Sequence, residues 1–220
     1  MIKTLTQVSC LVLVLLAPCC QYKPADFDWK EGDILFQDGD CGEFCEAIRK
    51  VTSGYDGHHF SHNGIVLKEN GRWMVIEAIR DGVILTPLDT FLNRHLTADG
   101  NPKVHVGRLR HPYRELIPEA LEYSKSLLGK PYDMAFDMSN EAYYCSELIH
   151  FSFKKANKGI GIFKTPPMTF LDPETAEVFP VWKKHFENLS LPVPEGKPGL
   201  NPGGMTQDPI IEMIFNFESP

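Results

Sequence analysis

A β-hairpin is the clearest element that the pattern of apolar and polar residues predicts. Residues 61–68 and 72–80 are strand-like runs rich in β-branched and apolar residues, and Asn70-Gly71 lies between them. An Asn-Gly pair in this position is typical of a two-residue turn between antiparallel strands. Such a turn sets the register of the two strands, with Glu69 facing Arg72.

That register decides where two polar side chains of the hairpin lie. His62 and Glu77 fall on one face as diagonal neighbours, roughly 7–8 Å apart at the backbone, within reach of each other. A four-residue loop keeps this pairing, whereas a three-residue loop shifts the register by one and puts them on opposite faces. Apolar residues occupy both faces of the hairpin, which indicates a sheet covered on both sides. Each polar group would then be buried and would need a partner.

The rest of the pattern predicts an α+β fold with a mostly antiparallel sheet flanked by helices. Asp40 is expected to cap the first helix. Proline and glycine dominate residues 192–204, so the C-terminal part is expected to wrap irregularly before a last strand. Strands are predicted over residues 32–37, 83–86, 103–109 and 209–217 besides the hairpin, and helices over residues 41–51, 87–93, 115–128 and 145–156.

Composition and charge narrow the classes of partner. Of the 220 residues, 43% are hydrophobic and 23% are charged, as in ordinary globular proteins, and this length suits a single domain. The formal net charge is −7, and no run of Lys and Arg is longer than two residues. Because binding to phosphates needs clustered basic side chains, nucleic acid is excluded as the expected partner.

Residues 1–20 have the pattern of an export signal. Lys3 supplies a positive start, and residues 8–17 form an apolar stretch that is too short to span a bilayer. We therefore expect the folded domain to comprise residues 21–220 and to face the periplasm or the cell exterior.

The end of this segment, Leu16-Ala-Pro-Cys-Cys20, resembles a bacterial lipobox, in which a cysteine becomes lipid-modified. Pro18 departs from the usual small residue. We expect lipidation of Cys20, or else of Cys19, with ordinary signal cleavage as the alternative. The lipid anchor would be the protein's one link to the membrane.

Export implies an oxidising compartment, in which thiols tend to pair. Cys41, Cys45 and Cys145 lie within the predicted domain, so one of them stays unpaired. Cys41 and Cys45 are close in sequence, but on one helix their side chains would fit a disulfide poorly. Cys145 would lie in the first turn of its helix, where free N–H groups and the helix dipole favour a thiolate. Taken alone, such a cysteine is more often a buried structural residue.

Acyl transfer by a cysteine gives a reason to group Cys145 with the hairpin. The chemistry needs a thiolate, an imidazole that takes and returns its proton, and a third group that orients the imidazole. Cys145, His62 and Glu77 are of these three types. A cysteine at a helix start, with a histidine and its orienting group on antiparallel strands, is the arrangement of papain-like enzymes. The order along the chain differs here, but such a triad is defined by geometry.

Five motifs between residues 32 and 153 strengthen this hypothesis. They are Gly32-Asp-Ile-Leu-Phe36, Phe60-Ser-His-Asn-Gly-Ile-Val66, Val75-Ile-Glu-Ala78, Gly129-Lys-Pro-Tyr-Asp133 and Tyr144-Cys-Ser-Glu-Leu148. Together, and in this order, they resemble the circularly permuted papain-like hydrolases of the NlpC/P60 superfamily, specifically the YiiX/YebB-like group. The resemblance implies a permuted papain-like fold, with Cys145 as nucleophile, His62 as base and Glu77 as the residue that orients it. The family often has Tyr where this chain has Phe60.

The implied activity is hydrolysis of amide bonds through a thioester, with backbone N–H groups near Cys145 stabilising the oxyanion. Gln37 and Tyr144 are candidate oxyanion or substrate contacts, although a surface amide is the simpler interpretation of Gln37. The expected substrate is a peptide, an amino-acid amide or a lipid-like molecule, with cell-wall peptides favoured. Two alternatives stay open: a lipid acyltransferase or thioesterase, whose site the apolar residues 210–217 could line, and a binding module without chemistry.

No cofactor and no metal site are predicted. His58 and His59 with Cys41 and Cys45 match no common zinc-binding spacing. Glu147, two residues after the candidate nucleophile, is interpreted as a structural side chain of the helix.

Overall fold

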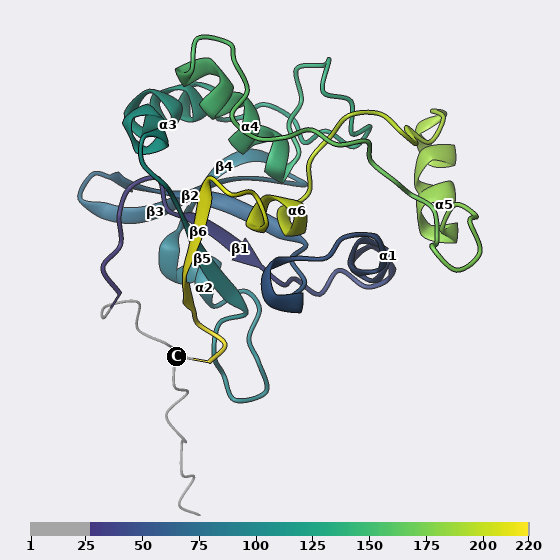
Figure 1. Cartoon of the computed structure of the whole chain (residues 1–220), viewed down its shortest axis with the longest axis horizontal. Coiled ribbons are helices and arrows are strands. Elements are labelled where there is room, and N and C mark those ends of the chain that lie inside the picture. The colour runs from purple at the N-terminus through teal and green to yellow at the C-terminus, as the bar shows by residue number, and fades with distance from the viewer. Residues whose placement is uncertain (1–26, 220) are drawn as a thin grey trace, which may run out of the picture.

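The computed structural model describes residues 27–219, which fold around one six-stranded sheet (Figure 1). All neighbouring strands are antiparallel, in the order β4-β3-β2-β1-β5-β6, which confirms the predicted fold class. The predicted export signal, with Cys19 and Cys20, lies outside the described residues. The strands are β1 (Ile34–Gln37), β2 (His62–Glu69), β3 (Arg72–Ile79), β4 (Gly82–Pro87), β5 (Val104–Leu109) and β6 (Ile211–Asn216).

Helices cover both faces of the sheet. α3 and α4 pack on one face and α2 on the other, while α1 and α5 lie together to one side (Figure 1). Within residues 27–219, no helix has the length and apolar character needed to cross a bilayer. The helices are α1 (Glu43–Val51), α2 (Leu88–Leu92), α3 (Ile117–Ser126), α4 (Cys145–Ala156), α5 (Pro180–Leu189) and α6 (Pro202–Thr206), with 3-10 turns η2 (Tyr55–Gly57) and η3 (Tyr113–Leu116).

The β2–β3 hairpin has the predicted register. Glu69 pairs with Arg72, and the turn residues Asn70 and Gly71 have φ angles of 50° and 80°. A type I′ turn requires positive φ at both of its central positions, which Asn and Gly adopt most easily. The sequence of the turn therefore fixes which residues of β2 and β3 share a face.

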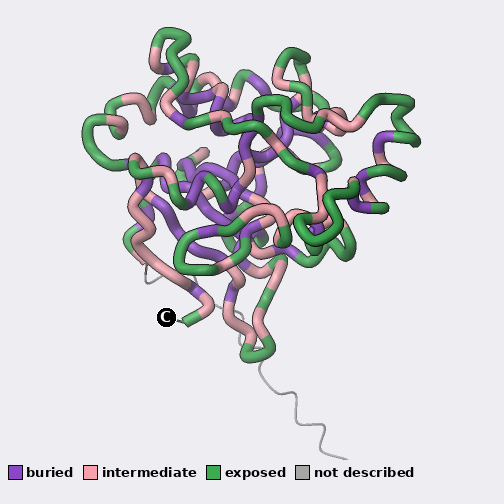
Figure 2. The backbone as a smooth tube through the Cα atoms, turned by 45° about the vertical axis from the view of Figure 1, so that its right-hand side comes forward, coloured by how far each residue is buried: buried purple, intermediate pink, exposed green. Residues whose placement is uncertain are grey.

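Both faces of the hairpin are buried, as predicted. Ile65 and Ile76 belong to the apolar cluster beneath α3 and α4. Val66 and Val75 belong to a second cluster, which includes Phe91 of α2. Figure 2 shows the strands as the buried middle of the molecule, with most exposed backbone in the loops around them. Polar groups at the ends of these strands are consequently placed by packing on two sides.

Two predictions about the first helix are wrong. α1 begins at Glu43, and Gly42, with a φ of 62°, takes the N-cap position that we expected for Asp40. Cys41 therefore lies before the helix, and it forms a disulfide with Cys45 across a Cα–Cα distance of 5.1 Å. The poor fit that we expected assumed that both cysteines were on one helix. The left-handed turn at Gly42 removes that constraint.

The chain after α4 is more regular than predicted. α5 starts with Pro180 and buries Trp182 and Phe186 in a cluster with residues of α1. α6 is capped by the side chain of Asn201, which accepts a hydrogen bond of 2.7 Å from a backbone N–H of the first turn. The proline content concealed these helices, because proline at the first helical position opens a helix as readily as proline elsewhere ends one. The last predicted strand is present as β6.

Gly64 allows β2 and β3 to approach closely at the position of Glu77. A Cβ atom on Gly64 would lie 2.5 Å from Val75 Cγ1, 3.0 Å from the Ile76 carbonyl oxygen and 3.2 Å from Glu77 Cβ. Because strands packed on both faces cannot move apart freely, Gly64→Ala is expected to lower the free energy of unfolding by about 1–3 kcal/mol. Urea unfolding followed by circular dichroism measures this change.

Gly204→Ala is the matched control for this substitution. Gly204 is exposed on α6, its φ is not positive, and an added Cβ would come no closer than 3.3 Å to the neighbouring Asn201 side chain. It is expected to change the free energy of unfolding by less than about 1 kcal/mol. Equal unfolding midpoints for Gly64→Ala and the parent protein would contradict the argument from close approach.

Candidate active site

Cys145 is the first residue of α4, as the sequence predicted. Tyr144 occupies the N-cap position in an extended conformation, so the N–H groups of the first helical turn have no partner within the helix. The positive end of the helix dipole favours negative charge at this point. Among the described residues Cys145 is the one free cysteine, and its side chain lines a cavity.

His62 lies at the start of β2, between Cys145 and Glu77. Its Nε2 is 2.5 Å from Oε2 of Glu77, and Cys145 lies close enough to the ring to raise its pKa. Since Nε2 faces the carboxylate, Nδ1 is the nitrogen available to the sulfur. Burial lowers the pKa of His62, but the hydrogen bonds and negative charges of Cys145 and Glu77 outweigh burial and raise this pKa to about 9. The ring is therefore an imidazolium at neutral pH.

Glu77 is fully buried, and each of its oxygens accepts hydrogen bonds. Arg94 donates to both oxygens, at 2.9 and 2.6 Å, and the Thr86 hydroxyl donates to Oε1 at 2.5 Å. Burial raises the pKa of Glu77, but hydrogen bonds from Arg94, His62 and Thr86 lower it to about 2 overall. Glu77 therefore remains a carboxylate at neutral pH and fixes the orientation of the imidazole.

Arg94 and Thr86 were not predicted from the sequence. Ile84 pairs with Glu77, so Thr86, two residues further along β4, is its diagonal neighbour on the same face. The two-residue turn at Arg80-Asp81, between the paired residues Ile79 and Gly82, sets this register. Arg94 follows α2, and no periodicity in the sequence indicates its direction.

Phe91 of α2 packs against the side chains of both His62 and Arg94. Its ring stacks with the ring of His62 at 5.8 Å between centroids, and the Arg94 guanidinium lies 5.2 Å from the Phe91 centroid. The carbonyl oxygen of Phe91 accepts a hydrogen bond of 2.9 Å from the side-chain amide of Gln37. Gln37 is buried and lines the cavity with Cys145. Its interpretation as a surface amide is therefore wrong.

Tyr144 connects α4 to the segment before α6. Its hydroxyl accepts a hydrogen bond of 3.0 Å from the backbone N–H of Leu200, and it lines the cavity beside Cys145. Burial raises the pKa of Tyr144 well above its ordinary value, so the phenol stays protonated at neutral pH. Tyr144 thus has a structural contact in addition to its position at the cavity.

Glu147 caps the helix on which it lies. Its Oε2 accepts a hydrogen bond of 3.2 Å from the backbone N–H of Tyr144. Burial raises the pKa of Glu147 to about 8, so at neutral pH this side chain is mostly uncharged. A neutral Glu147 does not oppose negative charge on Cys145, which lies two positions before it.

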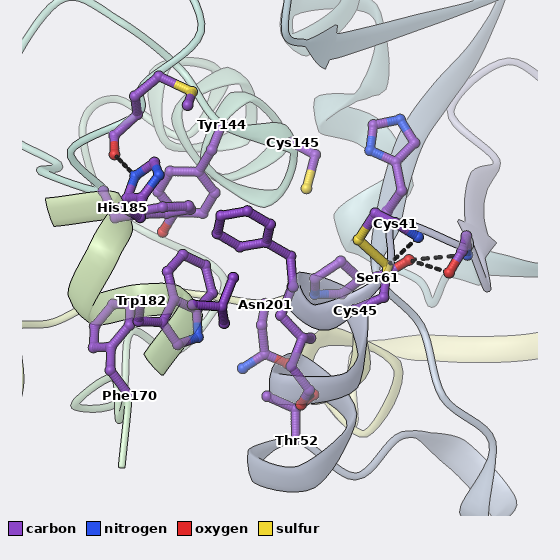
Figure 3. Close-up of a pocket in the computed structure, with 18 of the residues that line it drawn as sticks. Cys41, Cys45, Thr52, Ser61, Tyr144, Cys145, Phe170, Trp182, His185 and Asn201 are labelled. Carbon is purple, nitrogen blue, oxygen red and sulfur yellow. Dashed lines mark hydrogen bonds between the residues drawn. A yellow bond between two sulfur atoms is a disulfide. The ribbon is translucent and has the colours of Figure 1, made fainter. Parts of the chain in front are cut away.

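A cavity of about 1120 Å³ opens beside Cys145. Figure 3 shows the Cys145 sulfur directed into this cavity, with the Cys41–Cys45 disulfide on one side and Trp182 and Phe170 on the other. The wall away from Cys145 comes mainly from α1, α5 and two connecting segments, and it is rich in apolar side chains. Among these are Phe44, Ile48, Phe136, Met168, Phe170 and Trp182.

Asp133, the last residue of one of the five motifs, shapes the rim of the cavity. Its buried carboxylate accepts three hydrogen bonds of 2.6 to 3.0 Å from groups within residues 135–140. These bonds fold the segment back on itself, so that Tyr132 and Phe136 both line the cavity. The motif therefore builds the wall beside Cys145.

Residues 210–217 do not line the cavity, so the expectation that they could form a lipid site is wrong. β6 is the edge strand next to β5, and β5 and β1 separate it from β2 and β3, the strands that carry His62 and Glu77. Ile211 packs into the cluster beneath α3 and α4, and Phe217 packs into the cluster on the opposite face. The apolar residues of this segment therefore pack in the hydrophobic core and do not form a binding site.

Comparison with known proteins agrees with this architecture. A family model described as the permuted papain-like amidase enzyme, YaeF/YiiX, C92 family matches residues 28–215. The uncharacterized protein YiiX of Escherichia coli strain K12 is 28% identical over 144 residues, which are 63% of this chain. The match spans 62% of that relative, less than two thirds of its length.

A solved structure shows the same fold. It is the crystal structure of metalloprotein YiiX from Escherichia coli O157:H7, which matches 86% of this chain and 98% of its own with a TM-score of 0.70 and 23% sequence identity. Since the family match covers nearly all described residues, and the sheet with its helix-start cysteine has the expected form, the chain belongs to the YaeF/YiiX (C92) family of permuted papain-like amidases, which are cysteine hydrolases of the amidase or peptidase type.

Proposed function

We propose that this chain hydrolyses amide bonds with Cys145 as nucleophile, His62 as general base and acid, and Glu77 as the residue that orients His62. The observation that carries the proposal is the position of His62, which hydrogen-bonds to the buried Glu77 carboxylate and has Cys145 near enough to raise its pKa. These are the three roles that a cysteine acyl-transfer mechanism requires.

In the first step, the Cys145 thiolate attacks the acyl carbon of the amide. The backbone N–H groups at the start of α4 are the donors that we assign to stabilise the oxyanion. The His62 imidazolium donates its Nδ1 proton to the leaving nitrogen as the carbon–nitrogen bond breaks, which leaves a thioester on Cys145. His62, now neutral, takes a proton from water, which attacks the thioester and releases the carboxylic acid and the thiolate.

The cavity supports a substrate with an apolar group on one side of the scissile bond. Side chains such as Phe44, Phe170 and Trp182 form its aromatic wall. A substrate binds most tightly to such a wall when it buries an apolar group there, because apolar surface of both is then removed from water. Cell-wall peptides, the substrate that export suggested, would need to place an apolar side chain there. An amide of a long acyl chain or of an apolar amino acid fits the same wall directly.

The second candidate function is acyl transfer or thioester hydrolysis on lipids. The observation that favours it is the same apolar wall, which suits an acyl chain. Incubation with muropeptides, acyl amides and acyl lipids, each with and without an alcohol acceptor, distinguishes these functions by their products. Turnover of lipids alone would replace the amidase proposal with this second one.

We also propose that the enzyme works outside the cytoplasm as a lipid-anchored protein. The signal-like residues 1–20 support this location, and so does the disulfide between Cys41 and Cys45, because such bonds persist mainly in oxidising compartments. Mass spectrometry of the mature N-terminus tests the anchor: a lipid on Cys20 or Cys19 is expected.

The position of Cys145 at the start of α4, beside the His62 imidazolium, predicts high reactivity toward alkylating reagents. At pH 7, iodoacetamide is expected to modify Cys145 roughly tenfold faster than a free thiol, because the helix N-terminus and the imidazolium both attract a negatively charged sulfur. His62→Ala is expected to reduce the rate to that of a free thiol, whereas His111→Ala, at an exposed histidine remote in sequence, is expected to leave it unchanged. Peptide mass spectrometry locates the label. Slow labelling of the parent protein would contradict the proposed nucleophile.

The raised pKa of His62 predicts a decline in activity at alkaline pH. The imidazolium must protonate the leaving nitrogen, so kcat/KM is expected to fall as pH rises through about 9, where His62 loses its proton. Glu77→Gln removes a hydrogen bond and a negative charge that raise this pKa, so the decline is expected at lower pH. Histidine NMR titration measures the same pKa without substrate. An unchanged pKa in Glu77→Gln would show that Glu77 does not act on His62.

The apolar wall predicts selectivity for the acyl group. Phe44→Ala is expected to lower kcat/KM roughly tenfold for amides of long or aromatic acyl groups, because apolar contact is lost, and to change it little for acetyl amides. Ile160→Ala, at an exposed apolar residue that does not line the cavity, is the control. Equal losses for both substrate series would indicate a general structural effect of Phe44→Ala.

A further inference from the structure

A second group of ionisable side chains lies on the other face of the sheet from His62. In the central strand β1, Gln37 pairs with His62 of β2, and the preceding residue Phe36 pairs with His105 of β5. Successive residues of a strand point to opposite faces. His105 therefore projects to the face opposite His62, the face that carries Phe36.

His105 meets two other side chains there. One ligand atom each from His58, His105 and Glu218 lies within 4.8 Å of the other two, and no other group of three His, Cys, Asp or Glu side chains within residues 27–219 gathers in this way. His105 is 3% exposed, and its Nε2 has no hydrogen-bond partner. A buried nitrogen without a partner is costly.

The surrounding structure holds the three side chains in place. The His105 ring packs against the rings of His58 and Phe60, with centroids 4.3 and 5.0 Å away. Asn216 pairs with His105 across β5 and β6, so Glu218, two residues further on, lies toward the same face. The backbone N–H of Glu218 donates to the Asn216 side chain at 2.8 Å.

We propose that His58, His105 and Glu218 bind a divalent first-row transition-metal ion, Zn²⁺ above all, with solvent completing the coordination. Two imidazoles and one carboxylate form a ligand set that binds Zn²⁺ in preference to Mg²⁺ and Ca²⁺, because those two ions take oxygen ligands. Cys41 and Cys45, whose spacing with His58 and His59 matches no common zinc-binding signature, cannot contribute, because they form a disulfide.

The distances favour a shared ion over a direct bond. Nε2 of His105 is 3.6 Å from Oε1 of Glu218, too far for a hydrogen bond. Metal–ligand bonds of about 2.0–2.2 Å in tetrahedral geometry place neighbouring ligand atoms about 3.3 Å apart. Since no pair is more than 4.8 Å apart, the ligand atoms must close by at most about 1.5 Å, which rotation of the partly exposed His58 and Glu218 side chains can supply.

The three ligands come from segments that are far apart in the sequence. His58 follows η2, His105 is in β5, and Glu218 follows β6. A bound ion would connect the end of the chain to the segment that leads into β2. That segment carries His62 four residues after His58, so the ion would stabilise the fold beside the triad without taking part in the reaction.

Metal binding is tested in the full chain with Cys145→Ser, which prevents the active-site sulfur from binding zinc. After removal of metal with a chelator, dialysis against Zn²⁺ is expected to leave one equivalent per chain, measured by inductively coupled plasma mass spectrometry. A Zn²⁺ concentration 100 times the Kd is expected to raise the Tm by about 5–10 °C. Ca²⁺ at the same concentration is expected to leave the Tm unchanged.

Two substitutions at the partly exposed ligands identify the site. His58→Ala and Glu218→Gln, each added to Cys145→Ser, are expected to weaken zinc binding at least tenfold, while His59→Ala at the exposed neighbour of His58 is expected to retain it. Circular dichroism checks that each variant is folded. Stoichiometric binding that survives both ligand substitutions, or a folded Cys145→Ser protein that retains no zinc, would overturn the proposal. Neither result bears on the amidase proposal, because alkylation of Cys145 tests that separately.

Discussion

The buried carboxylate of Glu77 is the constraint on which the site depends. An ionised group with no exposure to solvent costs several kcal/mol unless charges and hydrogen bonds compensate, and here Arg94, Thr86 and His62 provide them together. These three partners come from the segment after α2, from β4 and from β2. The carboxylate therefore links the β2–β3 hairpin, the β3–β4 hairpin and the end of α2. This arrangement fixes the orientation of the imidazole.

Part of this arrangement follows from local sequence. The Asn70-Gly71 turn determines the register of β2 and β3, and the register alone puts His62 and Glu77 on one face. The apolar periodicity after Cys145 predicts a helix that starts at that residue, which is where α4 begins. The three elements that carry the triad, β2, β3 and α4, are thus determined by interactions between residues that are near each other in the chain.

The rest depends on conformations and contacts that no local pattern encodes. The direction of Arg94 depends on how Phe91 packs against the sheet, and the disulfide of Cys45 depends on a positive φ at Gly42, which moves Cys41 off the helix. The metal ligand set proposed on the opposite face joins β5 to a chain end, a contact between distant segments. Sequence spacing describes such sites poorly, because their geometry is set by sheet order.

The order of elements along the chain separates the chemistry from the selection of substrate. His62, Glu77, Thr86 and Arg94 all lie within one continuous stretch, so the base and its supporting charges form from contacts that are local in sequence. The nucleophile follows on α4, while the apolar wall is shared between α1, which precedes His62, the segment around Phe136, and residues 166–201. Changes in those segments can alter which acyl group fits while the hydrogen bonds of Glu77 stay intact. A permuted chain can therefore keep one reaction centre and vary its substrate through α1 and residues 166–201, neither of which carries a residue of the triad.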